Sequence, residues 1–155
     1  MIRIHKSPTA DTRTCDFANV SKRTLLLSSV QHITDVGKAL GFFSSLLTRA
    51  AVRHDFDKLT DIDRFHADFI TGFKETGWWD RHRKLNRHHL FQEDGIPEDV
   101  NLIDVLDMIS DCVMAGMARS GGVSLLEIDP ALLKRAFDNT VYLLKAEVTV
   151  ALEDK

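Results

Sequence analysis

The three prolines of the chain lie far apart, and this limits what it can fold into. They stand at positions 8, 97 and 130, and a proline inside a helix interrupts it. In the long stretches between them, apolar residues recur at steps of three and four, the spacing of a helix with one apolar face. No stretch shows the sustained alternation that is typical of strands. The sequence therefore predicts an all-α fold.

The spacing predicts helices over residues 21–51, 60–77, 98–119 and from Pro130 onward, with a short helix or turn over 80–91. Asp129 followed by Pro130 is a favoured start for the last helix. Residues 1–20 are expected to be irregular, with a short extended piece at residues 2–4, and residues 21–155 to form a single domain, because 155 residues suit one domain. Three apolar stripes should face the core: residues 33, 36, 40, 43, 47 and 50; residues 102, 106, 109 and 113; and residues 132, 133, 136, 137, 141 and 144.

Charge and cysteine content restrict the setting in which the protein works. The net charge of −3 does not indicate the positive surface that would attract nucleic acid or an anionic membrane. No apolar run approaches the roughly 18 residues of a membrane span. Cys15 and Cys112 each stand alone, so neither a disulfide framework nor a zinc motif is indicated. A reducing cytoplasm is the expected location.

Histidines gather in one part of the chain. Five of the seven lie between residues 54 and 89, at positions 54, 66, 82, 88 and 89. Within this part, His54 and Asp55 are adjacent, just after an apolar run. His32 lies beside the first apolar stripe and should point inward. Imidazole and carboxylate ligands together suit zinc, manganese, iron, cobalt or nickel, so these residues are candidate metal ligands. The alternatives are a core histidine for His32 and surface polar residues for His88 and His89.

A stripe of carboxylates lies on the helix expected over residues 98–119. Asp104, Asp107 and Asp111 are spaced by three and four residues. At about 100° per residue they lie within some 60° of one another. Any of the three could complete the metal site, and a solvent-exposed helix face is the alternative.

The order of these residues resembles a known superfamily. His32, then His54-Asp55, then an acidic residue in a later helix, resemble the HD superfamily of metal-dependent phosphohydrolases. With Lys58, the pair looks like the His-Asp-x-x-Lys form found in cyclic-dinucleotide phosphodiesterases, whose double histidine resembles residues 88–89. The chain lacks their following glycine-proline segment, so a cyclic dinucleotide is not the expected substrate. The pattern over residues 24–145, which includes segments 86–89 and 107–111, more closely resembles a small uncharacterised HD-like family of phages and bacteria.

This resemblance implies an HD-type bundle of five to six helices and a ligand set. His32, His54 and Asp55 would hold the metal. Asp111 matches the last ligand of the family best, because small residues follow it, and Asp107 and Asp104 remain alternatives. The cofactor would be one or two divalent ions, with Mn, Co, Zn, Mg, Fe and Ni all compatible with such ligands.

Four further side chains are candidates for catalysis or phosphate binding. Lys58 could contact a phosphate oxygen and stabilise developing charge. Arg87 could clamp a phosphate, because a guanidinium fork matches phosphate geometry. His88 and His89 could bind a second metal or protonate the leaving group. Surface pairing is the alternative for Lys58 and Arg87.

The expected function is that of a metal-dependent phosphohydrolase in which a metal-activated water attacks phosphorus. The substrate would be small and phosphorylated, most plausibly a nucleotide or deoxynucleotide. A nucleic-acid polymer and a membrane are not expected as partners, and a homo-oligomer is left open. Two alternatives stand beside it: a di-iron HD-fold oxygenase, and a non-catalytic phage-type protein that binds a nucleotide or a host protein.

Overall fold

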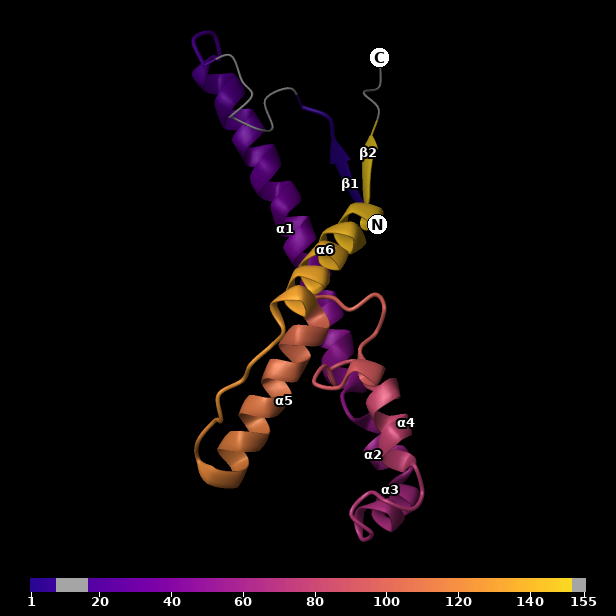
Figure 1. Ribbon diagram of the computed structural model, residues 1–155. Coiled ribbons are helices and arrows are strands. Elements are labelled where there is room, and N and C mark those ends of the chain that lie inside the picture. Colours follow the sequence, from indigo (N-terminus) through magenta and orange to yellow (C-terminus); the bar gives the residue numbers. More distant parts are fainter. Residues whose placement is uncertain (8–16, 152–155) are drawn as a thin grey trace. The chain divides into compact units, whose positions relative to one another are not determined.

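The computed structural model describes residues 1–7 and 17–151, and these are predominantly helical (Figure 1), which confirms the all-α class. A parallel pair of short strands accompanies the helices. None of the helices in the described ranges is both long and apolar enough to cross a membrane. In chain order the elements are β1 (Ile2–His5), α1 (Lys22–Arg53), α2 (Phe56–Thr60), α3 (Ile62–Phe69), α4 (Trp78–Leu85), the 3-10 helix η2 (Glu93–Gly95), α5 (Leu102–Ser120), α6 (Pro130–Glu147) and β2 (Val148–Ala151).

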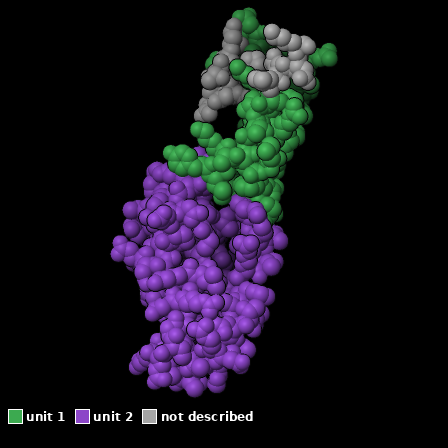
Figure 2. Space-filling view, turned by 90° about the vertical axis from the view of Figure 1, so that its right-hand side faces the viewer, with its two compact units in different colours: residues 1–45, 142–155 green, residues 46–141 purple. Residues whose placement is uncertain are grey.

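The chain divides into two compact units (Figure 2), a division that the expectation of one domain over residues 21–155 does not contain. The first unit comprises residues 1–45 and 142–155, and the second comprises residues 46–141. Helices α1 and α6 each contribute residues to both. Part of the segment expected to be irregular, including Cys15, lies outside the described residues.

The first unit joins the two ends of the chain in one small sheet. β1 and β2 pair in parallel, with Ile2 opposite Val148. Side chains of α1 hold β1 in place. Lys38 Nζ donates to the carbonyl of Arg3 at 3.0 Å, and Gln31 Nε2 donates to that of His5 at 2.8 Å. The strand at residues 2–5 confirms the short extended piece expected at residues 2–4.

The second unit has a small apolar core where α5 meets α6. Thr140 Oγ1 accepts the amide of Leu102 at 2.8 Å, which ties the start of α5 to α6. Asn101 caps α5 and forms a capping box with Asp104. The buried residues of this core are Leu90, Val100, Val105, Met108, Leu132 and Ala136.

The predicted core faces of the long helices are partly wrong. On α5 the buried side chains include Val105 and Met108, whereas Leu106 and Ile109 are exposed. On α6, residues 132, 136 and 140 are buried, but residues 133, 137 and 141 are exposed. On α1, Ile33, Val36, Leu40 and Leu47 are exposed too. These helices carry more apolar surface than one core face can bury, so periodicity alone selects the wrong stripe.

The helix expected over residues 60–77 is also wrong in extent. The helix in this segment, α3, spans only Ile62–Phe69, and Asp61, whose φ of −127° and ψ of 39° are not helical, separates it from α2. After α3 the chain turns through Gly72 and Phe73, both with positive φ. Phe65, Phe73 and Trp78 pack their rings together beside this turn. The aromatic cluster and the turn thereby lead the chain into α4.

Candidate metal centre

Asp55 sits at a sharp turn between α1 and α2. Its φ of 53° and ψ of 19° place it in the left-handed region, which aspartate tolerates better than most residues. The amide of His54 still bonds to Ala50 at the end of α1, and that of Lys58 bonds to Asp55 at the start of α2. The turn therefore directs two adjacent side chains, His54 and Asp55, into one site.

Helix α4 brings a third side chain, His82, to the same place. Buried Asp68 fixes the start of α4, because its carboxylate accepts the amides of Thr76 at 2.9 Å and Trp79 at 3.1 Å. One turn further on, His82 is fully buried, with its ring stacked on that of Trp78. The segment after α4 then adds His88 and His89, whose rings lie 4.3 Å apart between centroids.

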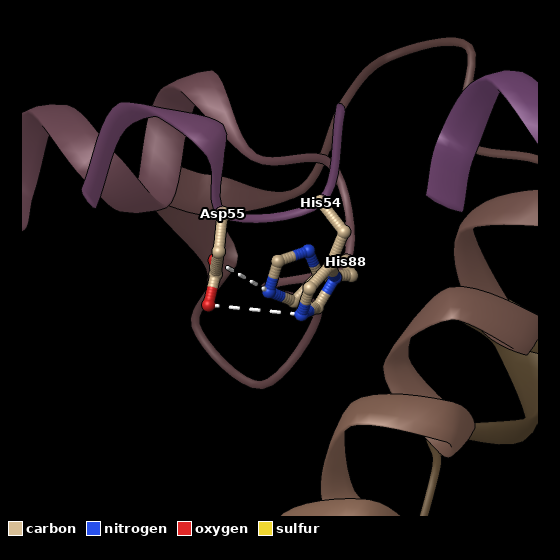
Figure 3. A group of neighbouring side chains, drawn as sticks. All are labelled: His54, Asp55 and His88. Carbon is tan, nitrogen blue, oxygen red and sulfur yellow. Dashed lines mark ion pairs between the residues drawn. The ribbon is translucent and has the colours of Figure 1, made fainter. Parts of the chain in front are cut away.

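These side chains form two groups of metal-ligating atoms that share Asp55. The first group is His54, Asp55 and His88, shown in Figure 3. The second is Asp55, His82 and His89. In each group the ligand atoms lie within 4.8 Å of one another. Each group could hold a metal ion, with Asp55 as the ligand that the two groups have in common.

The distances in these groups fit donors to a common cation better than hydrogen bonds. Asp55 Oδ1 lies 3.3 Å from His82 Nε2 and 3.5 Å from His88 Nε2, and Asp55 Oδ2 lies 3.6 Å from His54 Nε2. Two donors that each bind a metal at about 2.0–2.2 Å are themselves separated by roughly 3.0–3.5 Å. Among the described side chains, Asp55 Oδ1 and the Nε2 atoms of residues 82, 88 and 89 are buried without a hydrogen bond. Buried polar atoms without partners are costly, and a bound ion would satisfy them.

Carboxylates on the far side of two histidines orient them toward Asp55. His54 Nδ1 lies 2.9 Å from Asp107, and His82 Nδ1 lies 2.9 Å from Asp57. A metal-binding histidine usually donates its other ring N–H to such a group, which leaves the remaining nitrogen free to bind the ion. Asn86 supports the second pair, because its side chain donates to Asp57 and accepts the amide of Asp55.

Shifted pKa values keep three of the donors, Asp55, His88 and His89, in their ligating forms. Burial opposes ionisation of Asp55, but His82 and Lys58 outweigh it and hold the pKa of Asp55 well below its usual range. Burial lowers the pKa of His88. Burial, together with the neighbouring His88 and His82, lowers the pKa of His89 to about 4. At neutral pH the site therefore presents an ionised carboxylate and neutral His88 and His89.

Most of the predicted site residues come together in the second unit. His54, Asp55, His88 and His89 all belong to the two groups. Of the three candidate aspartates, Asp111 faces the metal-binding side of His54, with Oδ1 3.7 Å from Nε2. Asp107 instead holds the opposite nitrogen of that ring. This geometry favours Asp111 as a further ligand and Asp107 as an orienting group.

Lys58 and His32 lie in different surroundings. Lys58 Nζ donates to Asp55 Oδ2, so it borders the centre as expected. His32 belongs to the first unit and is exposed on α1, contrary to the expectation that it points inward. It takes no part in the groups found among the described residues. Its assignment as a ligand stays a prediction from the resemblance.

Arg87 and Asp104 pair with each other instead of facing the centre. The guanidinium donates to both oxygens of Asp104, at 2.8 and 2.9 Å, and to Asp99 at 2.9 Å. Asp104 also accepts the amide of Asn101 in the capping box. These contacts give Arg87 and Asp104 a structural role. They favour the alternative of surface pairing for Arg87 and a capping role for Asp104, whereas the roles of phosphate clamp and ligand stay predictions.

Sequence reasoning missed three residues of the centre. His82 was counted among the clustered histidines but not selected, and neither Asp57 nor Asn86 was given a role. One signal was available: His82 and Asn86 are four residues apart, so Asn86, the residue that follows α4, can reach back to His82 on the last turn of the helix. The pairing of His82 with Asp57 depends on how α4 packs near α2, which periodicity does not reveal.

The donors together define a candidate centre for one or two divalent cations, built from nitrogen and oxygen ligands with an outer layer of carboxylates. Comparison with protein-family models, with curated proteins and with solved structures finds no match.

Proposed function

We propose that the protein is a metal-dependent hydrolase that cleaves a phosphate ester or anhydride in a small substrate, most plausibly a nucleotide. The observation that carries the proposal is the set of unpartnered ring nitrogens around one carboxylate, Asp55. Two neighbouring cations suit phosphoryl chemistry, because together they can clamp the attacking and leaving oxygens. The order of His54-Asp55, Lys58 and the double histidine, which resembles HD phosphohydrolases, supports the same reaction.

The residues of the centre would have three roles: to bind the ions, to orient the ligands and to stabilise charge on the substrate. His54, Asp55, His88 and Asp111 would hold one ion, and Asp55, His82 and His89 the other. Ions held there supply Lewis acidity and lower the pKa of a water. Asp107 and Asp57 keep the rings of His54 and His82 oriented. Lys58 Nζ donates to Asp55, so its ammonium group borders the centre and would stabilise charge that develops on the substrate.

The first experiment measures metal content and activity on the same sample. The purified chain is stripped with a chelator, reloaded with manganese, cobalt, zinc, iron or magnesium, and assayed for phosphate release from nucleotides and p-nitrophenyl phosphate. We expect up to two ions per chain, and activity that depends on them. His54→Ala and His82→Ala should each lose about one ion and most activity, because each removes a donor from one group.

A matched control keeps this test specific. His66 is an exposed histidine outside both groups, so His66→Ala should retain metal and activity. Full activity in His54→Ala and His82→Ala would overturn the site assignment. Two irons after anaerobic purification, with no phosphate release from any substrate, would overturn the hydrolase proposal and favour the alternative of a di-iron oxygenase. Tight nucleotide binding without turnover would instead favour a binding protein.

A further inference from the structure

An apolar groove lies between the last turns of α1 and the middle of α5, within the second unit. Its volume is about 460 Å³. Its polar lining consists of His54, Asp107 and Asp111 of the candidate metal centre, together with Ser110. Met114, on its wall, is 69% exposed. The apolar walls are formed by Leu47, Ala50, Ala51, Leu106, Met114 and Ala115.

Helix α5 has a second apolar face next to this groove. Val105 and Met108 already pack in the core of the unit. Leu106, Ile109 and Met117 lie on another face and are 40–50% exposed. A helix that is apolar on more than one side is usually buried on more than one side. The exposed apolar face of α5 is therefore expected to pack against another protein surface.

The first part of α1 carries an unpaired apolar ridge. Its members are spaced by three to four residues and lie within about 120° of one another on the helix. Ile33 is 68% exposed, and its neighbours on the ridge are also exposed. The ridge consists of Leu26, Val30, Ile33, Val36 and Leu40.

The ridge of one chain cannot fill the groove of the same chain. Leu47, Ala50 and Ala51 of the groove belong to α1, the continuous 32-residue helix that carries the ridge. A helix cannot fold back on itself without breaking its backbone hydrogen bonds. A second copy, which offers the same ridge and the same groove, has no such restriction.

We propose that the protein is a homodimer in which the α1 ridge of each copy packs against the α1–α5 groove and the adjoining second apolar face of α5 of the other. Such an exchange is isologous, since each copy presents the same pair of surfaces, and it closes after two copies. The inference rests on the exposed apolar side chains and does not depend on the reaction proposed above.

The apolar area is what a stable dimer needs. Ten residues of the ridge, the groove and the second face of α5 are each about half exposed, from 39% to 69%. At about 100 Å² for a fully exposed large aliphatic side chain, they would bury on the order of 500 Å² per copy. A standard interface covers about 800 Å² per partner, of which roughly 60% is apolar. The ten are residues 26, 30, 33, 36, 40, 47, 106, 109, 114 and 117.

The test is the mass of the full chain in solution over a range of concentrations, by light scattering and sedimentation. We expect twice the chain mass of 17.5 kDa. Leu40→Glu on the ridge and Met114→Glu in the groove should each shift the protein to monomers, because each puts a charge into the interface. Both side chains are exposed in the single chain, so circular dichroism should show an unchanged helix content.

Matched variants make the result decisive. Leu59 on α2 is 73% exposed outside the ridge and the groove, so Leu59→Glu should remain dimeric. If a glutamate variant does not fold, Ile33→Gln and Met117→Gln are milder substitutions on the same surfaces and should weaken the dimer at least tenfold. A wild-type monomer at every concentration would overturn the proposal. Dimers that persist in folded ridge and groove variants would overturn it as well.

Discussion

The imidazole of His82 and the carboxylate of Asp57 face each other across 25 positions of sequence. His82 Nδ1 lies 2.9 and 3.1 Å from the two oxygens of Asp57, and its Nε2 lies 3.3 Å from Asp55 Oδ1. One ring thus joins an orienting carboxylate to a candidate ligand. The pair fixes the ring by its Nδ1 side and leaves Nε2 directed at Asp55.

The first prediction concerns this orienting carboxylate. Asp57→Asn keeps the size of the side chain but removes the charge that favours a proton on His82 Nδ1. We expect metal affinity at the centre to fall by about 10- to 100-fold, as is usual for partners behind a ligand. Metal titration of the stripped protein measures it. Asp63 is exposed on α3, and Asp63→Asn should bind metal as the wild type does; equal affinity in both variants would contradict the role of Asp57.

The second prediction separates structural from ligating carboxylates on α5. Asp104→Ala removes the capping box and leaves Arg87 without its bidentate partner. We expect a loss of about 2–3 kcal/mol in the free energy of unfolding, because charge-assisted hydrogen bonds to a buried group are lost. Metal content per folded chain should not change.

Asp99 provides the matched control, because it also pairs with Arg87 but is 79% exposed. Asp99→Ala should cost well under 1 kcal/mol, as exposed pairs usually do. Urea denaturation of the two variants measures the difference. Loss of metal in folded Asp104→Ala would restore Asp104 as a ligand.

These contacts show how much of the fold and of the candidate site can be predicted from the sequence. The start of α6 was predictable, because Asp129 and Pro130 act locally. The adjacent pair His54-Asp55 and the double histidine were visible as well. The buried face of α5 was not, because two apolar stripes run along that helix and only the packing against α6 selects one. His82 was not predictable as a ligand for a similar reason. Its partner Asp57 lies near it only because α3 and the turn that follows it bring the chain back.

The third prediction concerns acid stability of the metal-free protein. Burial and neighbouring histidines lower the pKa of His89 to about 4, against an ordinary value near 6.5 in the unfolded chain. Between these values the unfolded chain binds more protons, so stability must rise with pH there. The contribution of His89 is complete above about pH 6.5 and is lost as the pH falls toward 4. His88, whose pKa burial also lowers, acts in the same direction.

Urea midpoints of the chelated protein at pH 7.5, 6.0 and 5.0 measure this loss. His89→Asn removes one contribution and should flatten the decline. His66→Gln alters an exposed histidine and should leave it unchanged. Equal declines in the wild type and in His89→Asn would show that His89 does not titrate as described.

The fourth prediction joins the proposed dimer to the ligand role that the resemblance gives His32. His32 is exposed on α1 beside the ridge, whereas His54 lines the groove. If the ridge of one copy enters the groove of the other, His32 would act on the centre of the partner copy. His32→Ala and His54→Ala should then each be inactive alone but complement each other when mixed.

The size of the recovery is set by how the copies combine. After the mixed chains have been dissociated and reassociated, half of the dimers contain one chain of each variant, and each of these has one site with both histidines. We therefore expect about a quarter of the wild-type activity and of its intact centres. Adding Leu40→Glu to both variants should abolish the recovery, because it removes the dimer. No recovery from two folded, dimeric, inactive variants would contradict a ligand shared between copies. Full activity of His32→Ala alone would remove His32 from the centre.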